Sequence, residues 1–154
     1  MEAVLELFQK NDVQYFLYEH APVHTSEEAS RVRGVELKTG VKAMLVREKE
    51  NEKFLLADVA ADRKLDFRKL EELAGAKHIR FATREEVISE TGCEPGSVHP
   101  IGALFGMETY LDTSVMENEF VNFNIGMLTR SVKVRSEDLF KVLLPEVIGD
   151  FSKT

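Results

Sequence analysis

The order of hydrophobic and polar residues predicts a chain in which helices and strands are mixed. Apolar residues at helical spacing from Val4 to Phe8 predict a first helix over 2–11. Short apolar and aromatic runs predict strands at 15–18, 42–48, 53–60, 79–82, 108–112, 119–124 and 131–135. The charged segment between 42–48 and 53–60 is typical of the turn of a β-hairpin.

Polar residues just before apolar stretches predict where the other helices begin. Side chains able to cap a helix N-terminus stand at Thr25, Asp66, Thr83 and Ser136. Each threonine is followed three residues later by Glu, which is the spacing of a capping box. Residues that end helices follow at Gly34, Gly75, Gly92 and Pro145.

These elements follow no regular strand–helix–strand period. We therefore expect an α+β fold, with helices flanking a mixed, mostly antiparallel sheet. No linker, repeat or low-complexity segment divides residues 1–154, so we expect one compact domain.

Composition places the chain among globular proteins. Apolar residues make up 44% and charged residues 31% of the 154 residues, which excludes a disordered or collagen-like chain. The chain contains no apolar run of ~18 residues that would suit a membrane helix, and its N-terminus lacks the basic start and apolar block of a secretion signal. Its single cysteine cannot form an internal disulfide, so we expect a cytoplasmic protein that is not attached to a membrane.

The charge is unevenly distributed. A net charge of −7 excludes a general nucleic-acid coat protein. However, residues 31–47 carry five basic residues and one acid, and residues 126–136 carry three basic residues and no acid. If these segments lie side by side, they form a site for a phosphate chain; the alternative is two solvated faces.

The familiar motifs of metal and nucleotide sites are absent. There is no P-loop, GxGxxG, HExxH or CxxC sequence. His20 and His24 are four residues apart, but Pro22 between them argues against a shared helix face. We expect no metal and no cofactor. Nothing indicates that Cys93 is activated by His99, so we interpret this cysteine as a small packing residue.

One stiff loop is a candidate for binding chemistry. It reads Gly92-Cys93-Glu94-Pro95-Gly96-Ser97-Val98-His99-Pro100. Its glycines permit backbone angles closed to other residues, and its prolines lower the entropic cost of ordering the loop. Free amides at Gly96, Ser97 and Val98 would hold an oxyanion or a carbonyl oxygen. The alternative is a stiff connecting loop without chemistry.

Lys42 is the second candidate, because it opens an apolar strand. A lysine at this place commonly extends its ammonium to solvent. Alternatively, the ammonium points into a cleft, where it would meet developing negative charge.

Taken together, these motifs resemble the YbaK/ProX-like family, the free-standing relatives of the editing domain of bacterial prolyl-tRNA synthetases. The chain shows the family's early stretch in His20-Ala21-Pro22 and Thr25-Ser26-Glu27-Glu28-Ala29, and then Lys42 at a strand start. The GxxPG signature with its usual extension covers residues 92–102, and the next strand ends in Asp112. The resemblance covers nearly the whole chain.

The resemblance implies an enzyme, an aminoacyl-tRNA deacylase that cuts the ester between a wrong amino acid and the terminal adenosine of tRNA. The implied substrates are tRNA-Pro charged with alanine or cysteine, the implied partners are tRNA and a prolyl-tRNA synthetase, and the implied sheet is partly barrel-like. In the family pattern Lys42 is the functional lysine, and Asp112 is an acidic position near the site. The family's substrate loop corresponds here to Gly92, Pro95, Gly96 and Ser97, next to Val98.

Two departures from the family pattern bear on function. Some members carry Asn directly after the lysine, where this chain has Ala43. Many have a histidine in the late strand region; this chain has none there, and Asn124 and Gly126 are the candidates to line the pocket instead. Two alternatives therefore stay open: a binding module that kept the fold and lost turnover, and an esterase of small aminoacyl esters.

Overall fold

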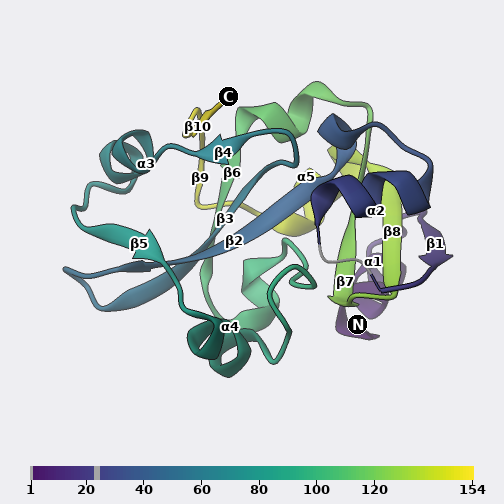
Figure 1. Ribbon diagram of the computed structural model, residues 1–154, viewed down its shortest axis with the longest axis horizontal. Coiled ribbons are helices and arrows are strands. Elements are labelled where there is room, and N and C mark those ends of the chain that lie inside the picture. Colours follow the sequence, from purple (N-terminus) through teal and green to yellow (C-terminus); the bar gives the residue numbers. More distant parts are fainter. Residues whose placement is uncertain (1, 23–24) are drawn as a thin grey trace.

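The computed structural model describes residues 2–22 and 25–154 (Figure 1). Its helices are α1 (Glu2–Lys10), α2 (Ser26–Arg33), α3 (Phe67–Ala74), α4 (Arg84–Thr91) and α5 (Ser136–Leu143). Its 3-10 turns are η1 (Leu37–Thr39), η2 (Gly102–Phe105) and η3 (Thr113–Glu117). Its strands are β1 (Phe16–Glu19), β2 (Val41–Glu48), β3 (Lys53–Ala60), β4 (Lys64–Leu65), β5 (Ile79–Phe81), β6 (Glu108–Asp112), β7 (Phe120–Met127), β8 (Arg130–Arg135), β9 (Val147–Gly149) and β10 (Ser152–Lys153).

The strands form three hydrogen-bonded sheets. The five-stranded sheet has the order β5-β2-β3-β6-β9, antiparallel from β5 to β3 and parallel from β3 to β9. The three-stranded sheet β1-β8-β7 and the pair β10-β4 are antiparallel. The predicted α+β class with a mixed, mostly antiparallel sheet is confirmed.

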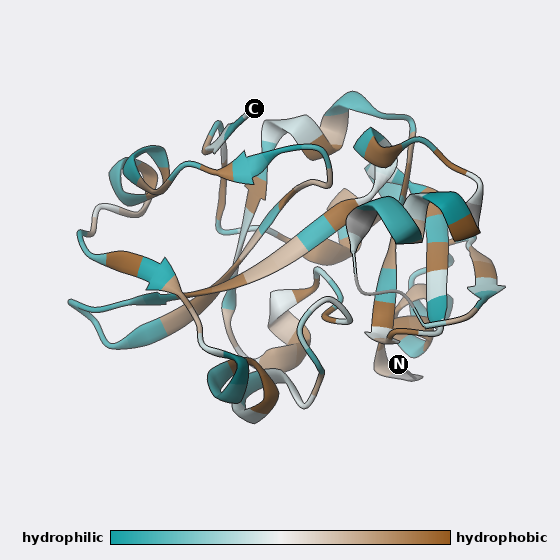
Figure 2. Ribbon diagram, viewed as in Figure 1, coloured by the Kyte–Doolittle hydropathy of each residue, from teal (hydrophilic) through white to brown (hydrophobic). Residues whose placement is uncertain are grey.

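The five-stranded sheet is buried on both faces. Leu55, Ala57 and Val59 of β3 pack on one face with Leu70 of α3, and Leu56 packs on the other face with Val87 of α4. Figure 1 shows α3 and α4 on opposite sides of this sheet. Strands buried on both faces read as nearly continuous apolar runs, and Figure 2 shows the apolar centre of β2 and β3 leading to a polar hairpin tip.

The three-stranded sheet has one apolar and one polar face. Val121, Phe123 and Ile125 of β7 pack into a core with Val4 and Phe8 of α1. Successive side chains of a strand point to opposite faces of the sheet. The β7 residues between these three therefore point away from this core. This alternation decides which β7 side chains are available for chemistry.

The predicted caps are confirmed at three of four positions. The side chains of Thr25, Asp66 and Thr83 each accept a hydrogen bond from the third residue beyond, and Thr83 completes a capping box. The predicted cap at Ser136 is wrong. This serine is the first residue of α5, and its amide and hydroxyl donate to the Glu119 carbonyl at 2.9 Å and 3.3 Å.

Three short strands were not predicted. β4, β9 and β10 have two or three residues each, and their partners lie far away in the sequence. Such strands exist only because a neighbouring edge is present. None of the described helices has the length and apolar character that crossing a membrane requires.

Candidate functional site

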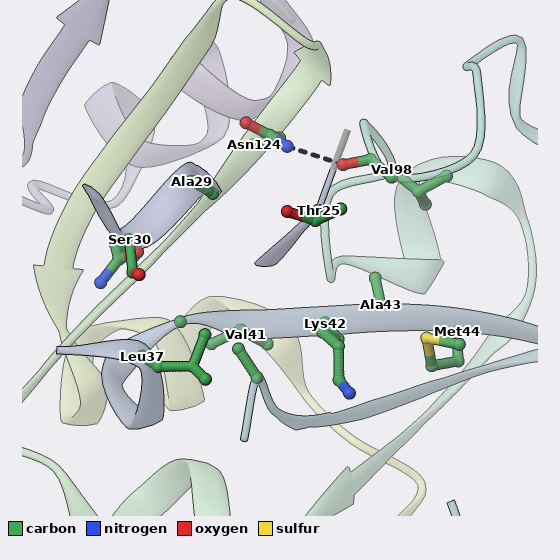
Figure 3. Close-up of a pocket in the computed structure, with 14 residues that line it drawn as sticks. Thr25, Ala29, Ser30, Leu37, Val41, Lys42, Ala43, Met44, Val98 and Asn124 are labelled. Atoms are coloured by element: carbon green, nitrogen blue, oxygen red, sulfur yellow. Dashed lines mark hydrogen bonds between the residues drawn. The ribbon is translucent and has the colours of Figure 1, made fainter. Parts of the chain in front are cut away.

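A cavity of about 220 Å³ lies where β2 begins, among α2, η1, β7 and the loop after α4. Its lining comprises Thr25, Ala29, Ser30, Leu37, 40–44, Ala61, Gly96, Val98, Asn122 and Asn124. Figure 3 shows the labelled side chains around the first residues of β2. The cavity therefore brings together four residues predicted from the sequence: Lys42, Gly96, Val98 and Asn124.

Two asparagines of β7 form the polar wall of the cavity. Because Val121, Phe123 and Ile125 point into the core, Asn122 and Asn124 point to the other face. The Asn122 amide group donates to the Thr39 hydroxyl at 2.9 Å. The Asn124 amide group donates to the Gly96 carbonyl at 2.6 Å, the contact drawn in Figure 3.

The predicted substrate loop contains a tight turn. Pro95 and Gly96 occupy its two central positions, and Gly96 has φ 89°. The Ser97 amide closes the turn by donating to the Glu94 carbonyl at 3.0 Å. Proline followed by a positive-φ glycine is typical of a type II turn. The predicted free amide at Ser97 is therefore wrong, and the Pro-Gly pair was the signal for this turn.

β7 holds the turn by donating hydrogen bonds to two carbonyl groups of the turn. Asn124 binds the Gly96 carbonyl, and the Gly126 amide donates to the Ser97 carbonyl at 2.8 Å. In a trans peptide the N–H points opposite to the C=O. The Val98 N–H therefore points away from β7. Within the described residues no partner is recorded for the amides of Gly96 and Val98, so these two are the available donors.

Lys42 lies in the cavity wall, but its ammonium has a partner of its own. Its Nζ donates to the Arg63 carbonyl. Figure 3 shows Lys42 and Ala43 on opposite sides of β2, with Ala43 directed toward the loop that carries Val98. Burial lowers the pKa of the Lys42 ammonium below its ordinary value.

Neighbouring charges both raise and lower the pKa of the Lys42 ammonium. The carboxylates of Glu27 and Asp62 act to raise its pKa, and the ammonium of Lys64 acts to lower it. The two acids thus favour the charged form against the effect of burial.

Other predicted site residues lie outside the cavity lining. Gly92 has φ 71° and ends α4, and Pro95 and Ser97 belong to the turn just described. Asp112 is buried and accepts hydrogen bonds from the Phe151 amide and the Ser152 hydroxyl, both at 2.8 Å. These contacts join β6 to the C-terminal segment, so the carboxylate holds the fold together at this point.

Asp58 is a buried acid that the sequence reading did not single out. It pairs in register with Ala43, a residue of the cavity wall. Its side chain is fully buried, and neither carboxylate oxygen has a hydrogen-bond partner in the described part of the chain. Burial raises the pKa of this carboxyl well above its ordinary value. The signal was an acid inside the apolar run Phe54-Leu55-Leu56-Ala57-Asp58-Val59.

Cys93 and His99 do not form a pair. The Cys93 thiol donates to the Thr91 carbonyl at 3.4 Å. The His99 ring stacks on Phe105 with centroids 4.2 Å apart, and its Nδ1 accepts from the Ile101 amide at 3.2 Å. Burial lowers the pKa of His99 to about 3, so the ring is neutral and serves as an acceptor and a packing surface.

Across 2–22 and 25–154 no three His, Cys, Asp or Glu side chains gather as metal ligands. His24, one of the two histidines considered above, lies outside these ranges.

The first basic segment contacts residues that precede the second one, beside the cavity. Gly40 forms a bridge to Asn122, and the Asn118 side chain donates to the Lys38 carbonyl at 2.9 Å. Lys38 of the first segment and Lys133 of the second line a common hollow.

The sequence is similar to proteins that edit aminoacyl-tRNA. The family described as the aminoacyl-tRNA editing domain matches residues 20–142. The multifunctional Ser/Thr-tRNA deacylase ProXp-y of Escherichia coli K12 is 28% identical over 151 residues, covering 96% of this chain and 90% of that protein. The prolyl-tRNA editing protein ProX of Acetoanaerobium sticklandii is 24% identical over 92% of this chain and 89% of its own length.

Part of a synthetase and two solved structures are also similar. The proline–tRNA ligase of Bacillus subtilis 168 is 34% identical over 70% of this chain, which spans 19% of that enzyme. The crystal structure of hypothetical protein APE2540 has a TM-score of 0.88 at 22% identity, over 97% of this chain and 99% of that one. A candidate trans-editing enzyme for prolyl tRNA synthetase has a TM-score of 0.83 at 23% identity, over 98% and 95%. At these identities the two structures show a shared fold.

Proposed function

The chain belongs to the aminoacyl-tRNA editing domain family, and from this premise we propose that it hydrolyses mischarged aminoacyl-tRNA. We propose that residues 1–154 act as one editing domain in the cytoplasm, with tRNA as the substrate and a prolyl-tRNA synthetase as a partner. One observation carries the proposal: Lys42, Gly96 and Val98 line the same cavity, and no partner is recorded within the described residues for the amides of Gly96 and Val98.

The reaction requires stabilisation of a negatively charged oxygen. A water oxygen attacks the ester carbonyl carbon, the bond from this carbon to the ribose oxygen breaks, and the ribose oxygen takes the proton. Negative charge builds on the carbonyl oxygen, where fixed donors lower the barrier. In the proposed site the donors are the amides of Gly96 and Val98. Asn124 and Gly126 act as positioning residues that hold the turn in place.

The proposed role of Lys42 uses donors that the fold leaves available. An ammonium carries three N–H groups, and the Arg63 carbonyl accepts one of them. Because the Lys42 side chain leaves β2 on the side opposite Ala43 and the loop that carries Val98, we propose that the other two donate to the phosphate of the terminal nucleotide. The Glu27 and Asp62 carboxylates support the charged form that this role needs.

The lining of the cavity suits a small aminoacyl group. Its lining combines the small residues Ala29 and Ala43 with the hydroxyl of Ser30 and the amides of Asn122 and Asn124. Alanine and cysteine remain the amino acids implied by the family pattern. Serine and threonine join them because of the name of the E. coli relative. A methylene is worth only ~1–3 kcal/mol in such a pocket, so a panel of substrates must decide among them.

The decisive test is deacylation of a panel of tRNAs by wild type and by Lys42→Ala. The panel contains tRNA-Pro charged with alanine, cysteine or serine, and tRNA-Thr charged with serine. We expect turnover of at least one member and a loss of kcat/KM of about 10–10² in Lys42→Ala, because losing a hydrogen bond from a charged group costs ~1.5–3 kcal/mol. Lys77→Ala, an exposed lysine outside the cavity lining, is the matched control.

Two outcomes would contradict the proposal in different ways. If wild type cleaves no member of the panel, the chain is a binding module. If Lys42→Ala cleaves as fast as wild type, the assignment of Lys42 is wrong. Cleavage of aminoacyl-adenosine as fast as of the tRNA would instead favour the small-ester reading.

A further inference from the structure

A second cavity opens next to the proposed catalytic cavity. It has a volume of about 420 Å³ and includes Lys38, Thr39, Asn118, Phe120, Asn122 and Lys133 in its lining. Asn122 lines both cavities, and its side chain donates to Thr39 at the boundary between them. A molecule that fills the first cavity and extends beyond Asn122 therefore enters the second.

The wall of the second cavity combines an aromatic ring with cations. The Lys133 Nζ and the Arg135 Cζ each lie 4.9 Å from the centre of the Phe120 ring. The pairing of β7 with β8 places these three side chains on one face, because Phe120 pairs with Arg135 and Asn122 pairs with Lys133. The two cations hold the ring in a fixed orientation, and a planar ligand that stacks on it takes the place of one of them.

The Lys133 ammonium of this wall contacts the Phe120 ring and has no recorded carboxylate partner in the described ranges, so it is the cation that can turn from the ring to an anion. Glu36 lies 3.7 Å from Lys38, and Glu119 lies 3.1 Å from Arg135, so both acids have a cation of their own. No carboxylate oxygen within 4.0 Å of the Lys133 ammonium is recorded in the described ranges. A ligand that brings an anionic group beside a flat ring would match this wall.

Resting on the proposed function, we propose that the second cavity binds the nucleotide that precedes the terminal adenosine of the RNA. Its base stacks on Phe120, and its phosphate approaches Lys133. Bases of single-stranded RNA commonly stack on aromatic side chains while cations contact the backbone. The same ring and ammonium thereby orient the ester in the first cavity.

The test measures binding of RNA separately from turnover. The probe is a fluorescently labelled, unacylated RNA tetranucleotide ending in cytidine-cytidine-adenosine. We expect Phe120→Leu to weaken its binding by about tenfold, as loss of one base stack does, and Phe120→Tyr to keep it. We expect Lys133→Gln to weaken binding and to reduce the salt slope by about 0.7, the value for one phosphate contact on a single strand.

Matched controls come from the opposite end of the molecule. Phe81 on β5 is 48% exposed and Lys77 lies nearby, and neither lines a cavity described above. Phe81→Leu and Lys77→Gln should bind the probe as wild type does. Binding of the probe by Phe120→Leu and Lys133→Gln at wild-type strength would overturn the proposal.

A second measurement separates the two proposals. The substrates are one aminoacyl ester on adenosine alone and the same ester on cytidylyl-adenosine. We expect a higher kcat/KM for the dinucleotide and a smaller gain from the extra nucleotide in Phe120→Leu. An equal gain in both proteins counts against the second cavity even when hydrolysis is fast. Absence of hydrolysis, together with probe binding that depends on Phe120, counts against the proposed function alone.

Discussion

Lys42 and Asp58 show how burial acts on two charges of opposite sign on neighbouring strands. β2 and β3 pair Lys42 with Val59 and Ala43 with Asp58. Burial lowers the pKa of the lysine and raises that of the aspartate, so it disfavours the charged form of each. Only Lys42 has a hydrogen-bond acceptor and nearby acids that oppose the effect. The lysine thus has groups around it that support its charged form, whereas burial acts on Asp58 toward the neutral form without such opposition.

The first prediction concerns the stability of Asp58→Asn as a function of pH. Below about pH 4 the carboxyl is protonated in both folded and unfolded chains, so it adds no pH dependence. Above this pH the unfolded chain loses the proton while the folded chain keeps it. The free energy of unfolding of wild type should then fall by up to about 1.4 kcal/mol per pH unit until the folded pKa is reached.

Asp58→Asn removes this titration. Its free energy of unfolding should therefore rise relative to that of wild type as the pH rises. Urea denaturation of both proteins at pH 5, 6, 7 and 8 measures the difference. A difference in unfolding free energy that stays constant over this range would show that the Asp58 carboxyl is ionised, with a partner, in the folded protein.

At the scale of elements, β7 supports both the core and the site. Its odd-numbered residues from Val121 pack against α1, and its even-numbered Asn122 and Asn124 form the polar wall of the cavity. Its bulge between Asn124 and Met127 includes Gly126, whose amide holds the Ser97 carbonyl. One strand therefore fixes the rigid turn at two points, which explains how a loop keeps its donors in place without a helix or sheet of its own.

Packing of η2 against β6 gives a prediction for this end of the loop. A Cβ atom at Gly102 would overlap the Thr109 hydroxyl and would lie 2.9 Å from the Met107 carbonyl oxygen. Gly102→Ala should lower the free energy of unfolding by about 1–3 kcal/mol, because backbone cannot move aside cheaply. Thermal or urea denaturation measures this loss.

Gly106 provides the comparison, because its Cβ would meet no atom within 4 Å, although its φ is +73°. Gly106→Ala should cost only the strain of that backbone angle, about 1–2 kcal/mol. An unchanged stability of Gly102→Ala would mean that η2 shifts freely and that its contact with β6 does not fix the loop.

At the scale of the whole molecule, one carboxylate joins distant parts of the chain. Asp112 ends β6, accepts from the Ser114 amide at 3.1 Å, and also accepts from Phe151 and Ser152 near the C-terminus. Phe151 is itself fully buried in the core of the five-stranded sheet. The C-terminal segment is thus fixed by a buried polar contact as well as by apolar packing.

The corresponding prediction is a global loss of stability in Asp112→Asn. The substituted side chain keeps one acceptor oxygen and places an NH₂ group beside donors. Leaving buried donors unsatisfied costs about 1–3 kcal/mol. Urea denaturation should show the lower free energy of unfolding. Unfolding identical to wild type would mean that Asp112 is free to serve the substrate, as the family pattern implies.

The sequence by itself determined the class of fold, the order of most elements and the family. Periodicity and caps are local properties of the chain, so they predicted the helices after Thr25, Asp66 and Thr83, and the GxxPG motif led to a family that the comparisons confirm. The same motif predicted that Gly96 and Val98 belong to a site, which remains a prediction. The functional role of Lys42 likewise remains a prediction.

Only the tertiary structure decided which groups share a cavity and which donors are free. The Ser97 amide is used inside the turn, Asp112 is used by the C-terminal segment, and the Lys42 ammonium contacts Arg63. It also decided that Asp58 is buried without a partner. The physical reason is that hydrogen bonding and burial depend on residues far apart in the chain, whereas a sequence pattern reports only on neighbours.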